Sequence, residues 1–172
     1  MSALRSDAQR NLERVLSAAA EAFAEHGPEV SVDEIARRAG VGHATVFRRF
    51  PTKDSLIAAV VHERVRELSA LAEEALAAGD PGLAFVDFVW RAAELHMEQR
   101  GLHACLARCD STEYLELERA ALLVTERAQK AGAIRRDLKP AEVAQLVRAA
   151  LQAAPPSNWR PFLRVVLDGL RP

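Results

Sequence analysis

Basic side chains gather in one short stretch of this chain. Between Ile35 and Lys53 there are five arginines and lysines and no acidic residue, whereas the whole sequence of 172 residues has a formal net charge of −1 at pH 7. Such a local excess of positive charge is typical of a surface that contacts the phosphates of a nucleic acid. The five residues are Arg37, Arg38, Arg48, Arg49 and Lys53.

The same stretch predicts two short helices joined by a tight turn. The helices are expected at residues 31–39 and 43–50. Ser31 and Glu34 match a capping box, in which each side chain satisfies a free backbone amide at the helix start. Gly40 is expected to end the first helix in a left-handed conformation. Two short helices around a glycine turn are typical of the helix-turn-helix motif.

The second helix of this motif is expected to expose a face that suits DNA. A projection at about 100° per residue turns Val46 and Phe50 inward and leaves Ala44 and Arg48 outside. A small residue at position 44 allows close approach to a groove, and an arginine can form two hydrogen bonds with guanine. The sequence therefore predicts that Arg48 reads a base.

Neighbouring side chains are better placed for the DNA backbone. Thr45 can donate to a phosphate, and Arg49 and Lys53 lie nearer the edge of the surface, where phosphates are contacted. Phe47 would be a large exposed aromatic side chain, which is unfavourable unless it meets a sugar or a thymine methyl group. The alternative interpretation of the whole surface is an ordinary solvated basic face.

A first helix at residues 11–26, the motif at 31–50 and the run 51–56 that enters a longer helix together resemble the DNA-binding domain of TetR-family transcriptional regulators. The resemblance covers about the first third of the chain. It implies an all-helical homodimer that binds operator DNA, usually as a repressor, and that is released by a small molecule in its C-terminal domain. The resemblance and the projection together predict DNA contacts by Arg37, Gly42, His43, Ala44, Thr45, Phe47, Arg48, Arg49 and Lys53.

Three positions depart from the pattern of that family. Members often have serine at the position of Gly42, tyrosine at that of Phe47 and histidine at that of Arg49. Glycine is a tolerable N-cap, but phenylalanine has no hydroxyl to give to a phosphate. We therefore expect Arg49 to carry more of the attraction to the DNA backbone.

The composition favours an all-α fold. Alanine, leucine, arginine and glutamate are abundant and aromatic residues make up only 5% of the chain, a bias that favours helix over strand. We expect a three-helix DNA-binding domain at residues 1–52 and a helical effector-binding and dimerisation domain at 53–172, with about nine helices in total. No window is apolar enough to span a membrane and the N-terminus lacks a secretory signal, so a cytoplasmic location is expected.

The resemblance implies an effector pocket among the middle helices. His96, on a helix expected at residues 83–99, projects opposite a narrow polar stripe, where an imidazole needs a partner. It is either a core histidine bonded to a backbone carbonyl or part of a ligand cavity for a hydrophobic organic molecule. The pocket candidates are Phe85, Phe88, Val89, His96, Met97, Leu106, Leu122 and Val147.

His103, Cys105 and Cys109 form the one cluster with metal-binding or redox chemistry. Two cysteines four residues apart share one side of a helix, which with the histidine would suit zinc or copper. Simple packing of two reduced thiols is the favoured interpretation, because spacing alone is poor evidence for a metal site. We predict no cofactor and no bound metal.

The last two helices, expected at residues 141–153 and 158–170, are apolar around most of their circumference. Two such helices from each of two subunits would form a four-helix interface with twofold symmetry. The DNA-reading helices would then lie about 34–36 Å apart, or a multiple of this, on a near-palindromic operator. The interface candidates are Val143, Val147, Leu151, Trp159, Phe162, Val166 and Leu170.

These patterns predict a ligand-released homodimeric repressor. A metal- or redox-responsive regulator using the His103, Cys105 and Cys109 cluster is the first alternative. A helical enzyme is the second, but the sequence contains no glycine-rich phosphate loop, no nucleophile elbow and no paired His-Glu metal motif. We therefore expect no catalytic activity.

Overall fold

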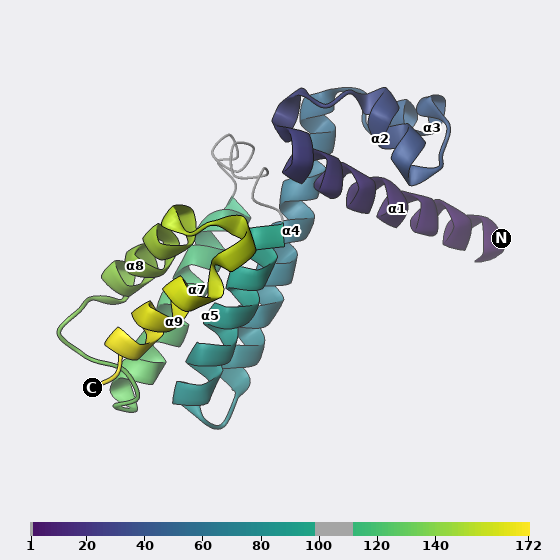
Figure 1. The fold of residues 1–172 in the computed structure, drawn as a ribbon. Helices are drawn as coiled ribbons and strands as arrows, with labels where there is room; N and C mark the ends of the chain where they lie inside the picture. The colour runs from purple at the N-terminus through teal and green to yellow at the C-terminus, as the bar shows by residue number, and fades with distance from the viewer. Residues whose placement is uncertain (1, 99–111) are drawn as a thin grey trace. The chain divides into compact units, whose positions relative to one another are not determined.

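The computed structural model describes residues 2–98 and 112–172, and the regular structure within these ranges is entirely helical, as predicted. The predicted short helix that carries His103, Cys105, Leu106 and Cys109 lies outside the described residues. The elements (Figure 1) are α1 (Ser2–His26), η1 (Gly27–Glu29), α2 (Val32–Ala39), α3 (His43–Arg49), α4 (Lys53–Ala77), α5 (Pro81–Glu98), α7 (Thr112–Lys130), α8 (Pro140–Ala153), η3 (Pro156–Asn158) and α9 (Arg160–Gly169).

The chain forms two compact units that divide within α4. The described part of the first, here the N-terminal unit, comprises residues 2–64 and Glu98. The second, the C-terminal unit, comprises residues 65–97 and 112–172. The functional boundary between residues 52 and 53 stays a prediction.

The core of the N-terminal unit is built from the apolar stripe of α1 and the inner faces of the three helices that follow it. Phe23 of α1, Ile35 of α2 and Leu56 of α4 are fully buried, and Val46 of α3 is 1% exposed. α1 begins nine residues before the predicted start at Asn11. The added segment contains neither glycine nor proline, so nothing in it interrupts a helix.

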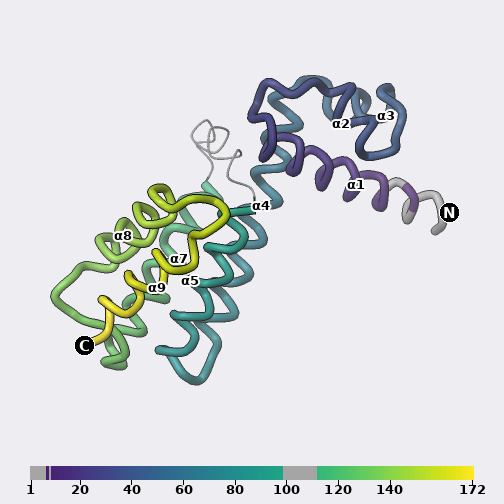
Figure 2. The backbone as a smooth tube through the Cα atoms, viewed as in Figure 1, coloured from purple at the N-terminus to yellow at the C-terminus, as the bar shows by residue number. Residues whose placement is uncertain are grey.

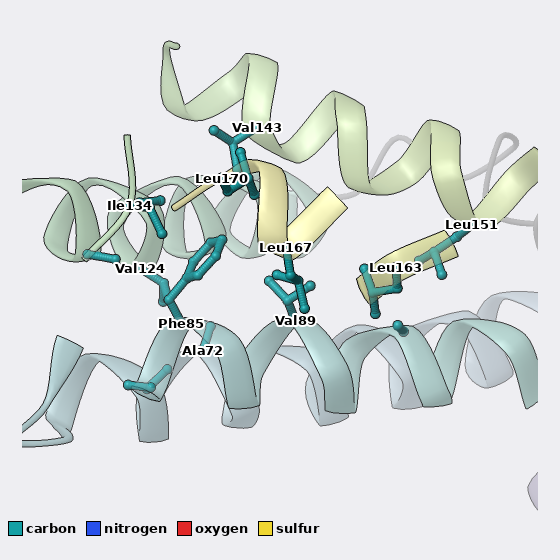
Figure 3. Close-up of a cluster of buried hydrophobic side chains, with 14 of the residues drawn as sticks. Ala72, Phe85, Val89, Val124, Ile134, Val143, Leu151, Leu163, Leu167 and Leu170 are labelled. Carbon is teal, nitrogen blue, oxygen red and sulfur yellow. The ribbon is translucent and has the colours of Figure 1, made fainter. Parts of the chain in front are cut away.

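The core of the C-terminal unit lies between the end of α4, α5, α7, α8 and α9. In Figure 3, Phe85 rises from α5 toward Ile134, and Leu167 of α9 points at Val89 of α5. Figure 2 shows the path from α7 through residues 131–139 into α8, and from α8 through η3 into α9. Gly132 turns the chain after α7 with a φ of 74°, a conformation that favours glycine.

Candidate nucleic-acid interface

The backbone of α2, the turn and α3 has the predicted helix-turn-helix form. Ser31 is the N-cap of α2, and its Oγ accepts a hydrogen bond of 3.2 Å from the amide of Glu34. Gly40 ends the helix in the left-handed region, at φ 62° and ψ 37°. Gly42 is the N-cap of α3 in an extended conformation. The predicted capping box is only half correct, because the Glu34 carboxylate binds arginines instead of the Ser31 amide.

α1 supports the turn through a contact that is distant in sequence. The Arg14 Nη2 donates a hydrogen bond of 3.1 Å to the carbonyl oxygen of Gly40. A Cβ atom at Gly40 would lie 2.5 Å from the same nitrogen, so a side chain there would displace the Arg14 guanidinium from this hydrogen bond. Glycine therefore serves both the positive φ of the turn and the approach of Arg14.

α3 turns one face into the core and leaves the other open. Val46 and Phe50 are buried, as the projection predicted. Gly42, His43, Ala44, Phe47, Arg48 and Arg49 are exposed, and Thr45 is half-buried.

An intramolecular stack explains why Phe47 can stay outside. Its side chain is 50% exposed, but its ring centroid lies 5.3 Å from that of His43, one helical turn earlier, at an interplanar angle of 41°. The His43 Nε2 also lies 3.4 Å from Oδ1 of Asp33 at the start of α2. The two rings thus form a small aromatic surface on the exposed face of α3.

The two arginines of α2 are tied to carboxylates. Arg37 donates from Nε and Nη2 to the two carboxylate oxygens of Glu34, at 2.9 and 2.7 Å. Arg38 donates to Glu34 at 2.8 Å and to Glu25 of α1 at 2.7 Å, and it lies 3.1 Å from the ring of His26. The hydrogen bonds from Arg37, and then the one from Arg38, lower the pKa of Glu34 to about 2.

The basic residues of α3 and of the start of α4 have no such partners. Within residues 2–98 and 112–172, Arg48, Arg49 and Lys53 form no ion pair or side-chain hydrogen bond. Lys53 is positioned by a reciprocal cap at the start of α4: the amide of Thr52 donates to Ser55 Oγ at 3.2 Å, and the amide of Ser55 donates to Thr52 Oγ1 at 3.1 Å. Among the basic residues between Ile35 and Lys53, those available to an external anion therefore lie on and beside α3.

The residues predicted for an effector pocket lie mostly in the core of the C-terminal unit. Phe85 and Val89 are buried, while Phe88, Met97 and Val147 pack on the core with part of their surface open. His96 and Leu122 are half-buried, and Leu106 lies outside the described residues. Only Phe85 among them lines the groove of about 780 Å³ that the described residues form in the C-terminal unit.

The residues predicted for a dimer interface divide between core and surface. Val143, Leu151, Trp159 and Leu170 are buried within the C-terminal unit itself, and Val147 and Val166 are partly buried. Phe162 is 42% exposed. The prediction did not single out Leu146 of α8 and Val165 of α9, which are 44% and 72% exposed. Helical period gave no signal for either residue, because both helices are apolar around most of their circumference.

The described residues contain neither a group of metal-binding side chains nor a membrane-spanning helix. None of their histidines, cysteines and acidic residues form a group of three or more that could hold a metal ion, and the predicted cysteine cluster lies outside them. None of the described helices combines the length and the apolar character needed to cross a membrane.

Both parts of the chain match models of known families. Residues 15–60 match the family described as bacterial regulatory proteins of the tetR family. Residues 80–172 match a family described as the C-terminal domain of SbtR-like transcriptional regulators. The fold and the exposed α3 thus define a helix-turn-helix regulator.

Individual relatives agree with this class. An HTH-type transcriptional repressor of Mycobacterium tuberculosis is 45% identical over 58 residues, but the match spans only 33% of this chain and 31% of the relative. An HTH-type transcriptional regulator of Mycobacterium bovis is 33% identical over 135 residues, which cover 71% of this chain and 68% of that protein.

Solved structures extend the likeness to nearly the whole chain. A TetR transcription regulatory protein of Mycobacterium vanbaalenii is 37% identical, with a TM-score of 0.72 and coverage of 98% of this chain and 99% of that one. A TetR regulator of Streptomyces coelicolor is 28% identical, with a TM-score of 0.71 and coverage of 93% and 98%. The chain belongs to the TetR family of transcriptional regulators, which are not enzymes.

Proposed function

We propose that the protein is a cytoplasmic, homodimeric repressor that binds a near-palindromic operator through α3 and leaves it when a hydrophobic organic effector binds. The observation that carries the DNA-binding part is the exposed face of α3. It combines a small residue, Ala44, with two arginines that have no partner in the described part of the chain. The name of the Mycobacterium tuberculosis relative supports the choice of repressor over activator.

Each contact on this face has a defined role in the proposal. Arg48 donates to a guanine edge in the major groove, where bases are distinguished. Thr45, Arg49 and Lys53 contact phosphates and set the position of the helix without reading sequence. The aromatic surface of His43 and Phe47 packs on a sugar or a thymine methyl group.

Dimerisation is proposed through α8 and α9. Leu146, Phe162 and Val165 leave apolar surface open on these helices, and a second copy with the same surface would cover it around a twofold axis. The buried candidates such as Val143 and Trp159 would support this surface from behind.

A dimerisation test compares two exposed apolar residues of similar accessibility. Val165→Glu should shift sedimentation velocity of the protein from dimer to monomer. Leu115 on α7 is 66% exposed and lies outside the proposed surface, so Leu115→Glu should leave the dimer intact. Equal behaviour of the two variants contradicts an interface at α9.

Release follows from a difference in affinity. The effector must bind the form with the wrong spacing of recognition helices more tightly than the DNA-bound form, because equal affinity changes nothing. We infer that binding in the C-terminal unit changes this spacing through α4, which contributes residues to both units.

Selection of bound duplexes from a random pool tests the function directly. We expect a near-palindromic motif whose affinity falls steeply with salt, since phosphate contacts release counterions. Absence of any enriched sequence contradicts operator binding. An enriched motif without twofold symmetry contradicts the dimeric arrangement alone.

A further inference from the structure

An open groove of about 780 Å³ lies in the C-terminal unit, outside most of the pocket residues predicted from sequence. It is formed by the start of α5, the turn after α7 and one side of α9. Its volume falls within the range of about 300–1,000 Å³ that is usual for small-molecule sites. The groove is thus large enough for an organic molecule.

The floor of the groove and the part of its rim on α5 are apolar. Phe85, Ile134 and Leu167 form a buried floor, and Figure 3 shows Phe85 and Ile134 facing one another. Leu83 and Val86, on the rim, are 71% and 38% exposed. Covering these side chains with an apolar partner would be favourable, because it removes apolar surface from water.

The charged groups around the groove are satisfied with one exception. The Asp80 carboxylate caps α5 by accepting hydrogen bonds from the amides of Gly82 and Leu83, at 2.9 and 3.0 Å. Asp168 forms an ion pair of 3.1 Å with Arg171. Arg164 lines the groove and has no hydrogen bond or ion pair with any other described residue.

We propose that this groove binds a hydrophobic monocarboxylate, such as a medium-chain fatty acid, with its carboxylate on Arg164. One available guanidinium beside an apolar floor complements one anionic head on an apolar tail. An arginine binds a carboxylate through two parallel hydrogen bonds, which a neutral head group cannot reproduce. The tail lies over Phe85 and Leu167 and covers Leu83 and Val86.

The inference deepens the effector part of the proposed function. It rests on that function only for DNA release, because binding itself is measured without DNA. The two can therefore fail separately.

Tryptophan emission provides a direct measurement of binding. The chain has two tryptophans. Trp90 lines the groove and its ring lies 5.7 Å from that of Trp159. We would titrate the full protein with decanoate and with 1-decanol, both below their aggregation limits, and record the emission of the indole rings.

Two variants and one control separate the charge from the groove. Arg164→Gln should weaken decanoate binding by about tenfold or more and leave 1-decanol unchanged, because only the carboxylate uses the guanidinium. Leu83→Glu should weaken decanoate further than 1-decanol, since it adds a like charge to the rim. Arg148→Gln on α8, outside the groove, should match the parent. All three positions are exposed, so folding is not at risk.

The outcomes are distinct. No saturable response to decanoate, equal affinity for decanoate and 1-decanol, or unchanged affinity in Arg164→Gln overturns the proposal. Decanoate binding that depends on Arg164 supports it. If such binding leaves operator affinity unchanged, the ligand site in the groove is supported and the effector role in the proposed function is contradicted.

Discussion

Two neighbouring helices of the N-terminal unit each carry two adjacent arginines, and their surroundings differ. On α2, Arg37 and Arg38 are held by Glu34, and Arg38 also by Glu25. On α3, Arg48 and Arg49 have no partner within the described residues. Adjacent charges in a sequence are therefore a poor guide to the charge that a ligand meets, because ion pairs remove part of it.

The two pairs of arginines therefore have different roles. On α2, Arg38 binds the helix to α1 through Glu25, and both arginines neutralise the Glu34 carboxylate. The α3 arginines remain available to an external anion. The ion pair of Arg37 with Glu34 argues against its predicted contact with DNA. Variants of both helices test this.

The largest effect is expected for Arg48→Ala. Loss of two hydrogen bonds to a guanine costs about 1–3 kcal/mol, which is a loss of affinity of roughly 5- to 150-fold. Fluorescence anisotropy with the selected duplex measures it, and discrimination at one base pair should relax as well. Arg37→Ala is the matched control and should lose much less. Similar losses of affinity in the two variants would contradict the difference between the α2 and α3 arginines.

Arg49→Ala should have a smaller effect that does not depend on sequence. A lost phosphate contact reduces the slope of log affinity against log salt by about 0.9. The measurement is a salt titration on the operator and on an unrelated duplex. If affinity and slope match the parent, Arg49 does not compensate for the missing hydroxyl of Phe47.

The same hypothesis predicts coupling between two positions. Phe47→Tyr supplies the hydroxyl that a phosphate can accept from, a gain of about 0.5–1.5 kcal/mol. The gain should be greater in the Arg49→Ala background than in the parent, because the two groups share one task. A double-mutant cycle measures this coupling, and strict additivity argues against it.

Glu34→Gln should convert α2 into a surface more like α3. The change removes the negative charge that pairs with Arg37 and Arg38, so non-specific affinity for DNA should rise a few-fold and its salt slope should steepen by about 0.9 for one added phosphate contact. Glu29→Gln is the control, because it removes one exposed negative charge that has no arginine partner among the described residues. Equal changes in both variants mean that net charge alone is responsible.

The smallest effect is a pH dependence of stability. The pKa of Glu34 is lowered from its ordinary value of 4.5 to about 2 by its arginine partners. Its contribution is therefore complete above about pH 4.5 and is lost as the pH falls toward 2. The difference in free energy of unfolding between the parent and Glu34→Gln should shrink over this window, as measured by urea denaturation. A difference that is constant with pH contradicts the ion pairs.

Much of the fold could be predicted because helix ends depend on local chemistry. The start of α2 after Ser31, its end at Gly40 and the end of α7 before Gly132 follow from caps and from the glycine preference for positive φ. Val46 and Phe50 were assigned to the core from helical period alone. The predicted start of α1 at Asn11 was too late. Residues 2–10 contain no glycine or proline, so the helix continues through them.

The apolar terminal helices show where periodicity is insufficient. It identifies α8 and α9 as apolar nearly all round, but it does not say which side meets the chain's own core. Packing buries Val143 and Leu151 and leaves Leu146 and Val165 exposed. That choice depends on where α5 and α7 lie, which no local pattern encodes.

Local sequence was enough to establish the helices, the motif and the side of α3 that faces outward, because these depend on residues within a few positions of one another. Contacts between distant residues needed the folded chain. Arg38 meets Glu25 across 13 positions, and Arg14 meets Gly40 across 26. The groove joins Leu83 to Arg164 in the same way. The pairing of charges, and hence which arginines remain available, is set by how helices pack against one another.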